Sequence, residues 1–204
     1  MSPTIYLRRH IMLRSDYADL ILKGKKRATV RLGRVIPKYR EVIIHSGGKP
    51  LCKVRIVKVT HKKVSELTDE DAIKDGFSSR RELLKELKKV YGRRLSGDEE
   101  VTVIEFEVLQ RLDRLSTEDP YMGLKPEDIA RLALRYARKE FIKEERRILE
   151  ELAKGKSIRE VAKELTGDPT RRWRVRSVLR RALKKLLEKG LLRAGGGSEN
   201  ALSG

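Results

Sequence analysis

The spacing of apolar residues changes near residue 113, and this change constrains the fold more than any other feature. Before it, short apolar stretches alternate with polar residues at a period of two, which is typical of half-buried strands. The clearest example runs from Val101 to Leu109. After it, apolar residues recur at the three- and four-residue spacing of a helix. The chain is therefore expected to be an α+β protein with two domains.

The first domain, residues 1–112, is expected to be a small β-barrel with helical insertions. Extended segments are predicted at Tyr6–Leu13, Thr29–Leu32, Val42–His45, Leu51–Thr60 and Val101–Leu109, where β-branched residues are frequent. Helices are predicted from 15 to about 23, over the acidic stretch 69–76 and up to residues 91–92, with Ser15, Thr68 and either Ser78 or Ser79 as their N-caps. Short strands separated by helices favour a barrel over a doubly wound sheet.

The second domain, residues 126–204, is expected to be helical, with residues 113–125 as a linker and a flexible C-terminal tail. Pro126 suits the first turn of a helix. Ser157 and Glu160 form a capping box that opens a short helix, and the break at 167–169 is followed by a longer basic helix that Gly190 ends. This order predicts a helix-turn-helix. Leu191–Arg193, followed by 194–198, could add a strand and the tip of a wing.

The charge balance points to a polyanionic partner. The chain has 49 Lys and Arg against 30 Asp and Glu, a net charge of +19. Residues 1–63 carry 17 cations and 3 acids, and residues 113–204 carry 23 and 15, whereas residues 64–112 carry 9 and 12. Two separate basic regions therefore exist, one in each half. Nucleic acid is the expected partner, ahead of an anionic membrane.

Several classes of protein are disfavoured. No apolar run approaches the ~18 residues of a membrane span, and the N-terminus lacks the apolar core of a signal peptide. Cys52 is the single cysteine, and His10, His45 and His61 lack metal-ligand spacing, so neither a disulfide nor a metal is expected. No phosphate-loop or dinucleotide motif appears, and no cofactor is predicted. A cytoplasmic protein is expected, and its charge-rich, amide-poor composition is typical of heat-adapted, here archaeal, proteins.

The long basic helix is the first candidate site. Ten Lys and Arg lie between positions 171 and 193, against Glu188 as the single acid. Four of the cations recur every fourth residue and so share a helix face. The residues expected to contact nucleic acid are Arg171, Arg172, Arg174, Arg176, Arg180 and Lys184. The alternative is a solvated cationic face, and Trp173 is expected to be a core anchor more often than a base-stacking residue.

A second candidate site surrounds the bend at 22–31, with the sequence LKGKKRATVR. Together with the LTDEDAIKDGF stretch at 67–77 and the VIEF stretch at 103–106, it resembles the ASCH family of PUA-like β-barrels over about residues 6–109. The resemblance implies a cleft that accepts RNA or a modified nucleoside. One group, the small bacterial acetylcytidine amidohydrolases, implies a catalytic lysine, threonine and glutamate, which match Lys26, Thr29 and Asp75 here. Asp75 is one methylene shorter than the glutamate.

The residues of the bend support two interpretations. A Thr hydroxyl near a lysine and a carboxylate can be an activated nucleophile. The neighbouring Lys25, Arg27 and Arg31 would lower the pKa of Lys26. Alternatively, the bend binds phosphate through Lys25, Lys26, Arg27 and Arg31. We therefore predict a nucleic-acid-binding protein, with a hydrolase of modified nucleosides or RNA as the alternative. A transcription regulator with a ligand-sensing barrel is a third hypothesis.

Overall fold

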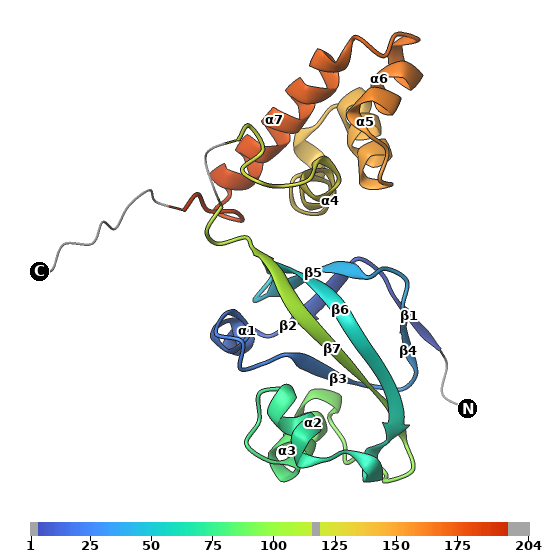
Figure 1. Ribbon diagram of the computed structural model, residues 1–204, viewed down its shortest axis with the longest axis vertical. Helices are drawn as coiled ribbons and strands as arrows, with labels where there is room; N and C mark the ends of the chain where they lie inside the picture. Colours follow the sequence, from blue (N-terminus) through green and yellow to red (C-terminus); the bar gives the residue numbers. More distant parts are fainter. Residues whose placement is uncertain (1–3, 116–118, 196–204) are drawn as a thin grey trace, which may run out of the picture. The chain divides into compact units, whose positions relative to one another are not determined.

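The computed structural model describes residues 4–115 and 119–195. The chain divides into two compact units, the first ending at Arg111 and the second beginning at Leu112. In Figure 1 the first unit is coloured from blue to green, and the second continues to red. All the strands of the described residues belong to the first unit, whereas the second unit is helical.

The first unit combines strands with short helices. In chain order its elements are β1 (Ile5–Leu7), β2 (His10–Leu13), the 3-10 turn η1 (Ser15–Tyr17), α1 (Ala18–Leu22), β3 (Ala28–Leu32), β4 (Val35–Pro37), β5 (Glu41–Ser46), β6 (Lys49–Lys63), the 3-10 turn η2 (Val64–Glu66), α2 (Asp69–Lys74), α3 (Arg80–Tyr91) and β7 (Glu100–Arg111). The five predicted extended segments are all present. The strand β4 was not predicted, because three residues that end in proline carry no periodic signal.

The main sheet of the first unit is a curled half-barrel with the strand order β2–β5–β6–β7–β3. β2 is parallel to β5, and the other neighbours are antiparallel. Register shifts in β6 next to Lys53 and Ile56 bend the long β6–β7 pair. Among the described residues the edge strands β2 and β3 do not pair with each other, so the expected barrel is open along one side. β1 and β4 form a separate parallel pair.

Residues on both faces of β7 are buried. Successive residues of a strand point to opposite faces, so β7 contributes to two separate cores. Ile104 and Phe106 pack in a core with Ile11 and Ile44 from the other strands. Val103 packs on the opposite face, in a second core that α2 and α3 cover. The strict alternation of β7 thus places the sheet between two apolar layers.

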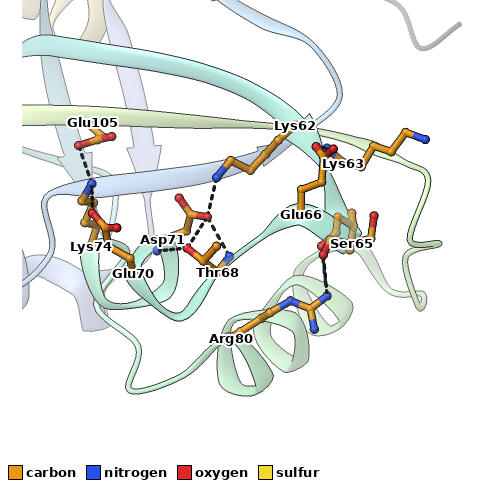
Figure 2. Close-up of polar contacts among 11 residues, drawn as sticks. Lys62, Lys63, Ser65, Glu66, Thr68, Glu70, Asp71, Lys74, Arg80 and Glu105 are labelled. Atoms are coloured by element: carbon orange, nitrogen blue, oxygen red, sulfur yellow. Dashed lines mark hydrogen bonds and ion pairs between the residues drawn. The ribbon is translucent and has the colours of Figure 1, made fainter.

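The helix α2 is fixed to the sheet by a network of polar contacts (Figure 2). Thr68 caps α2 as predicted, with its Oγ1 accepting from the Asp71 backbone nitrogen at 3.2 Å. Lys62 Nζ on β6 donates to Asp71 Oδ2 at 2.8 Å, and Lys74 reaches Glu105 on β7 at 3.3 Å. These contacts hold the C-terminal end of α2 beside β3. Asp75 follows this end as the C-cap of the helix.

Two expected N-caps have different outcomes. Ser79 caps α3, with its Oγ accepting from the Glu82 backbone nitrogen at 3.4 Å, so Ser79 rather than Ser78 is the cap. Ser15 does not cap a helix, and that prediction is wrong. Ser15 already lies in the 3-10 turn η1 before α1, where it packs against the β5–β6 turn at Gly47.

The second unit is a small helical bundle. Its elements are α4 (Pro126–Tyr136), the 3-10 turn η3 (Arg138–Glu140), α5 (Lys143–Ala153), α6 (Ile158–Thr166) and α7 (Arg172–Glu188). Pro126 begins α4, and the capping box of Ser157 and Glu160 begins α6, as predicted. The core consists of fully buried apolar side chains from all four helices, including Leu132, Leu149, Val161, Leu179 and Leu186.

The predicted wing does not form in the described residues. Residues 191–195 lie beside residues 112–115, where Leu115 donates to the Arg193 carbonyl at 2.9 Å and pairs with Ala194 in a parallel bridge. Backbone groups expected to pair in a hairpin are therefore used by the segment that enters the second unit. Residues 196–198 of the expected wing tip lie outside the described residues.

Candidate nucleic-acid interface

A pocket of about 120 Å³ opens in the first unit where the half-barrel is not closed. Its wall comes from both edge strands and from α3, and Arg31 on β3 donates to the Met12 carbonyl on β2 at 2.8 Å across the opening. Its polar and aromatic lining includes Tyr17, Lys26, Thr29, Arg31, Asp75 and Glu86. The pocket therefore contains the candidate catalytic residues Lys26, Thr29 and Asp75.

The cationic side chains of the bend before β3 point in different directions. The Lys26 side chain is buried at 2% exposure, whereas Lys25 and Arg27 on either side are exposed. The Arg27 backbone is held on both sides, because its nitrogen donates to the Lys74 carbonyl and its carbonyl accepts from Phe106. This backbone pairing fixes the alternating directions of the side chains along the bend, so the Lys26 side chain points inward. Lys25 and Arg27 do not line the pocket.

Lys26 and Asp75 form a buried ion pair. The Lys26 ammonium contacts Asp75 Oδ1 and donates to the Asp75 carbonyl oxygen at 2.7 Å. The other carboxylate oxygen, Oδ2, accepts from the Val30 backbone nitrogen at 2.9 Å. Both oxygens of Asp75 are thus occupied. The aromatic rings of Tyr17 and Phe77 lie 4.5 Å and 5.9 Å from the ammonium.

Burial is the largest influence on Lys26 and lowers the pKa of its ammonium to about 7. The positive charge of Arg31 lowers this pKa further, while Asp16 and Glu86 oppose the change. The sequence-based explanation, in which Lys25 and Arg27 also lower the pKa, is wrong because both side chains point to solvent. The neighbour that acts is Arg31, whose own pKa is lowered by burial.

Thr29 reaches the pocket from β3. Its backbone pairs with Ile104 on β7, and its side chain is buried at 4% exposure. Among the described residues no hydrogen bond to Thr29 Oγ1 is found, so this hydroxyl is available to a ligand. A buried hydroxyl beside a lysine that loses its proton near neutral pH can serve as a nucleophile.

Three residues at the mouth of the pocket were not predicted. Glu86 on α3 contacts Arg14 and accepts from the Tyr17 hydroxyl at 3.2 Å. Burial, followed by the charge of Glu86, raises the pKa of Tyr17 to about 12. No spacing in the sequence links Arg14, Tyr17 and Glu86, because a long stretch of chain separates the first two from the third. The signal that could have been used is the position of Glu86 on the inner side of α3, between buried Leu83 and Leu87.

The helix α7 in the second unit has one side paired with acids. Arg174 reaches Glu144 at 2.5 Å, and Arg181 reaches Glu145 at 2.6 Å. Lys185 contacts Glu140 and Glu188. These cations face α5 and the turn η3, and their charge is locally balanced.

The other side of α7 carries the predicted row. Arg172, Arg176 and Arg180 are exposed, and no acidic side chain pairs with them among the described residues. Lys184 continues the row and approaches Glu188 only at 3.9 Å. Arg171, just before the helix, lies 3.8 Å from Asp168. Because acids pair with the cations on only one side of α7, the row on the other side keeps an unbalanced positive charge.

Trp173 is not a core anchor, and the expectation that it packs inside is wrong. It is 68% exposed. The inner side of α7 is filled by the apolar residues Val175, Val178 and Leu179, so position 173 falls on the outer side of the helix. The large size of tryptophan favours its burial, but the helical period places position 173 on the outer side of α7.

The remaining candidates have structural partners. Cys52 is fully buried, as predicted. His10 Nδ1 and His45 Nε2 lie 2.8 Å apart, and His61 Nδ1 lies 3.0 Å from Thr102 Oγ1. In the described part of the chain no group of three or more His, Cys, Asp and Glu side chains is placed to hold a metal ion. None of the helices over residues 4–115 and 119–195 combines the length and apolarity of a membrane crossing.

Solved structures that are similar to about half of this chain include ASCH domains. Curated proteins include no match to the chain. Among solved structures, an ASCH domain from Lactobacillus crispatus is 20% identical, with a TM-score of 0.42, covering 51% of this chain and 79% of that one. A protein from Enterococcus faecalis is 21% identical, with a TM-score of 0.40 and coverage of 48% and 69%. An ASCH protein from Zymomonas mobilis is 16% identical, with a TM-score of 0.40 and coverage of 51% and 69%.

The family is established by its sequence model. The ASCH domain matches residues 4–110, which is more than half of the chain and spans every strand of the half-barrel. ASCH domains are PUA-like and are generally linked to RNA binding. The chain therefore belongs to the ASCH domain family.

Proposed function

We propose that the protein is a cytoplasmic, two-domain nucleic-acid-binding protein. Residues 1–112 form the ASCH domain, whose pocket takes RNA or a modified nucleoside. Residues 113–125 are the linker, and residues 126–204 form a helix-turn-helix domain that contacts a duplex. The order of α6, a short break and α7 supports the second assignment, with α7 as the recognition helix.

One observation carries this proposal: the unbalanced row of α7. Cations four residues apart repel one another by a few tenths of a kcal/mol per pair in an isolated helix. Acids balance the cations on the α5 side of α7, whereas within residues 4–115 and 119–195 none pairs with Arg172, Arg176 or Arg180. Phosphates would remove this repulsion and release counterions. The row is therefore assigned to the phosphate backbone.

Charge reversal tests the assignment. Arg176→Glu with Arg180→Glu is expected to abolish duplex binding in a gel shift and leave the helical circular dichroism unchanged. The matched control is Arg81→Glu with Lys85→Glu, which reverses two exposed cations at the same spacing on α3. The control should retain most of the affinity. If the α7 variant bound the duplex as tightly as the α3 control, α7 would not be part of the interface.

A second candidate function, hydrolysis of an acylated nucleoside, is favoured by the contents of the pocket. Thr29 Oγ1 would attack the acyl carbon while the neutral Lys26 amine takes the hydroxyl proton. The C–N bond would then break, Lys26 would return the proton to the leaving amine, and water would hydrolyse the ester on Thr29. Asp75, with both oxygens occupied, would position Lys26.

The hydrolase is tested with acetylcytidine and with structured RNA, and products are read by mass spectrometry. Turnover by the wild type that Thr29→Val abolishes, and Thr29→Ser retains, supports a nucleophilic hydroxyl. Absence of turnover, with no difference between the wild type and Lys26→Ala, leaves binding as the function of the pocket.

A further inference from the structure

Trp173 is the most exposed of the large apolar side chains in the described residues, at 68%. It has neither a hydrogen bond nor a ring contact within the described part of the chain. Fully burying a big apolar side chain stabilises a protein by roughly 1.5–3 kcal/mol. An exposed indole does not provide this stabilisation. Trp173 is therefore placed for contact with something other than its own domain.

Cations flank Trp173 along α7. Arg176 lies three residues further on, so the indole is beside the unbalanced row at that point. Residues three apart on a helix are surface neighbours. A ligand that covers the indole is thus within reach of the Arg176 guanidinium, which has no acidic partner among the described residues.

A second group of cations lies around a groove that is linked to α7 through Arg174, the residue after Trp173. Arg174 reaches Glu144, which lines a groove of about 560 Å³ at the start of α5. The two acids of the groove are engaged, Glu144 by Arg174 and Glu150 by Arg138 at 2.7 Å. The remaining lining residues are the cations Lys143, Arg146 and Arg147, which have no acidic partner among the described residues.

We propose that Trp173 stacks on an unpaired base of a nucleic acid whose phosphates lie on the α7 row and in the α5 groove. This inference rests on the proposed function and names its partner more closely, as a nucleic acid with a single-stranded segment. An aromatic platform between cationic tracks suits a chain that alternates flat bases with phosphates. Apart from the terminal pairs at its two ends, a blunt duplex presents only base edges in its grooves, so along such a duplex the indole would stay uncovered.

The test compares the full chain on a blunt duplex and on the same duplex with a single-stranded overhang. We expect tighter binding to the overhang by about fivefold or more, the range that stacking of one base provides. Trp173→Ala should erase this preference while keeping the affinity for the blunt duplex, and Trp173→Phe should retain part of it. Because Trp173 is the single tryptophan of the chain, its fluorescence should also be quenched by the overhang and not by the blunt duplex.

The outcomes separate this inference from the proposed function. Loss of all binding in Arg176→Glu with Arg180→Glu, together with an overhang preference that survives in Trp173→Ala, would overturn stacking and keep nucleic-acid binding. Failure of every nucleic acid to bind the wild type would overturn both. A fluorescence change that depends on protein concentration alone would show that a second copy covers Trp173, and would also overturn the inference.

Discussion

Removal of the buried pair in the pocket should abolish a specific pH dependence of stability. The perturbation is Lys26→Met combined with Asp75→Asn, which deletes both charges and keeps similar volumes. The side-chain amide oxygen that this second substitution introduces can still accept from the Val30 nitrogen, so the hydrogen bond to β3 is preserved. Replacing a buried ion pair with uncharged groups of similar size is often neutral or stabilising, by about 1–4 kcal/mol.

The magnitude follows from the pKa of Lys26, which is about 7 in the folded protein against an ordinary 10.5. Between these values the unfolded chain binds more protons than the folded one, so the free energy of unfolding rises with pH. The destabilisation is fully present below pH 7 and disappears as pH approaches 10.5. One proton corresponds to about 1.4 kcal/mol per pH unit, so the rise between about pH 7.5 and 9.5 is at most about 3 kcal/mol, because the contacting Asp75 carboxylate favours the charged form of Lys26.

The measurement is urea unfolding of the wild type and the double variant across that window. The upper limit avoids the region near pH 10, where Tyr17 starts to act in the opposite direction because its pKa is raised to about 12. The wild type should gain stability with pH, and the double variant should be nearly flat. An equal rise in both proteins would show that a group other than Lys26 is responsible for the pH dependence.

Three further perturbations have expected outcomes. Thr68→Ala removes the cap of α2 and should lower the free energy of unfolding by about 1 kcal/mol in urea titrations. Leu179→Ala, at a fully buried position, should cost about 2–5 kcal/mol by the same assay, and a smaller loss would mean that the bundle repacks. Neutralisation of both side chains, Arg176→Gln with Arg180→Gln, should weaken binding and reduce the slope of log affinity against log salt by about 2, and an unchanged slope would show that neither contacts phosphate.

The periodic elements of the fold were predictable because burial imposes its period on the sequence. β7 alternates strictly since each of its faces meets a core, and the capping box at Ser157 marks the start of α6 through local hydrogen bonds. The missed features depend on distant contacts. The segment after Gly190 pairs with residues 112–115 instead of forming a wing, and no local pattern signals that pairing.

The candidate site was predictable only where one motif contains its residues. The bend identified Lys26 and Thr29, and the acidic helix identified Asp75. The inward direction of Lys26 depends on backbone pairing of Arg27 with Lys74 and Phe106, which the sequence does not display. Glu86 reaches the pocket because α3 packs over the opening of the half-barrel, so its role is a property of tertiary structure.

The Lys26–Asp75 pair also bears on whether the pocket is functional. Two charges are desolvated in a place where apolar residues of similar volume would serve stability equally well or better. Arg31 adds a further positive charge nearby and lowers the pKa of Lys26, which increases the destabilisation. A purely structural position would not require a second cation beside a buried ammonium. The arrangement is instead what a site needs when its lysine must exchange a proton near neutral pH or meet an anionic ligand, because an incoming negative charge relieves the repulsion between Lys26 and Arg31.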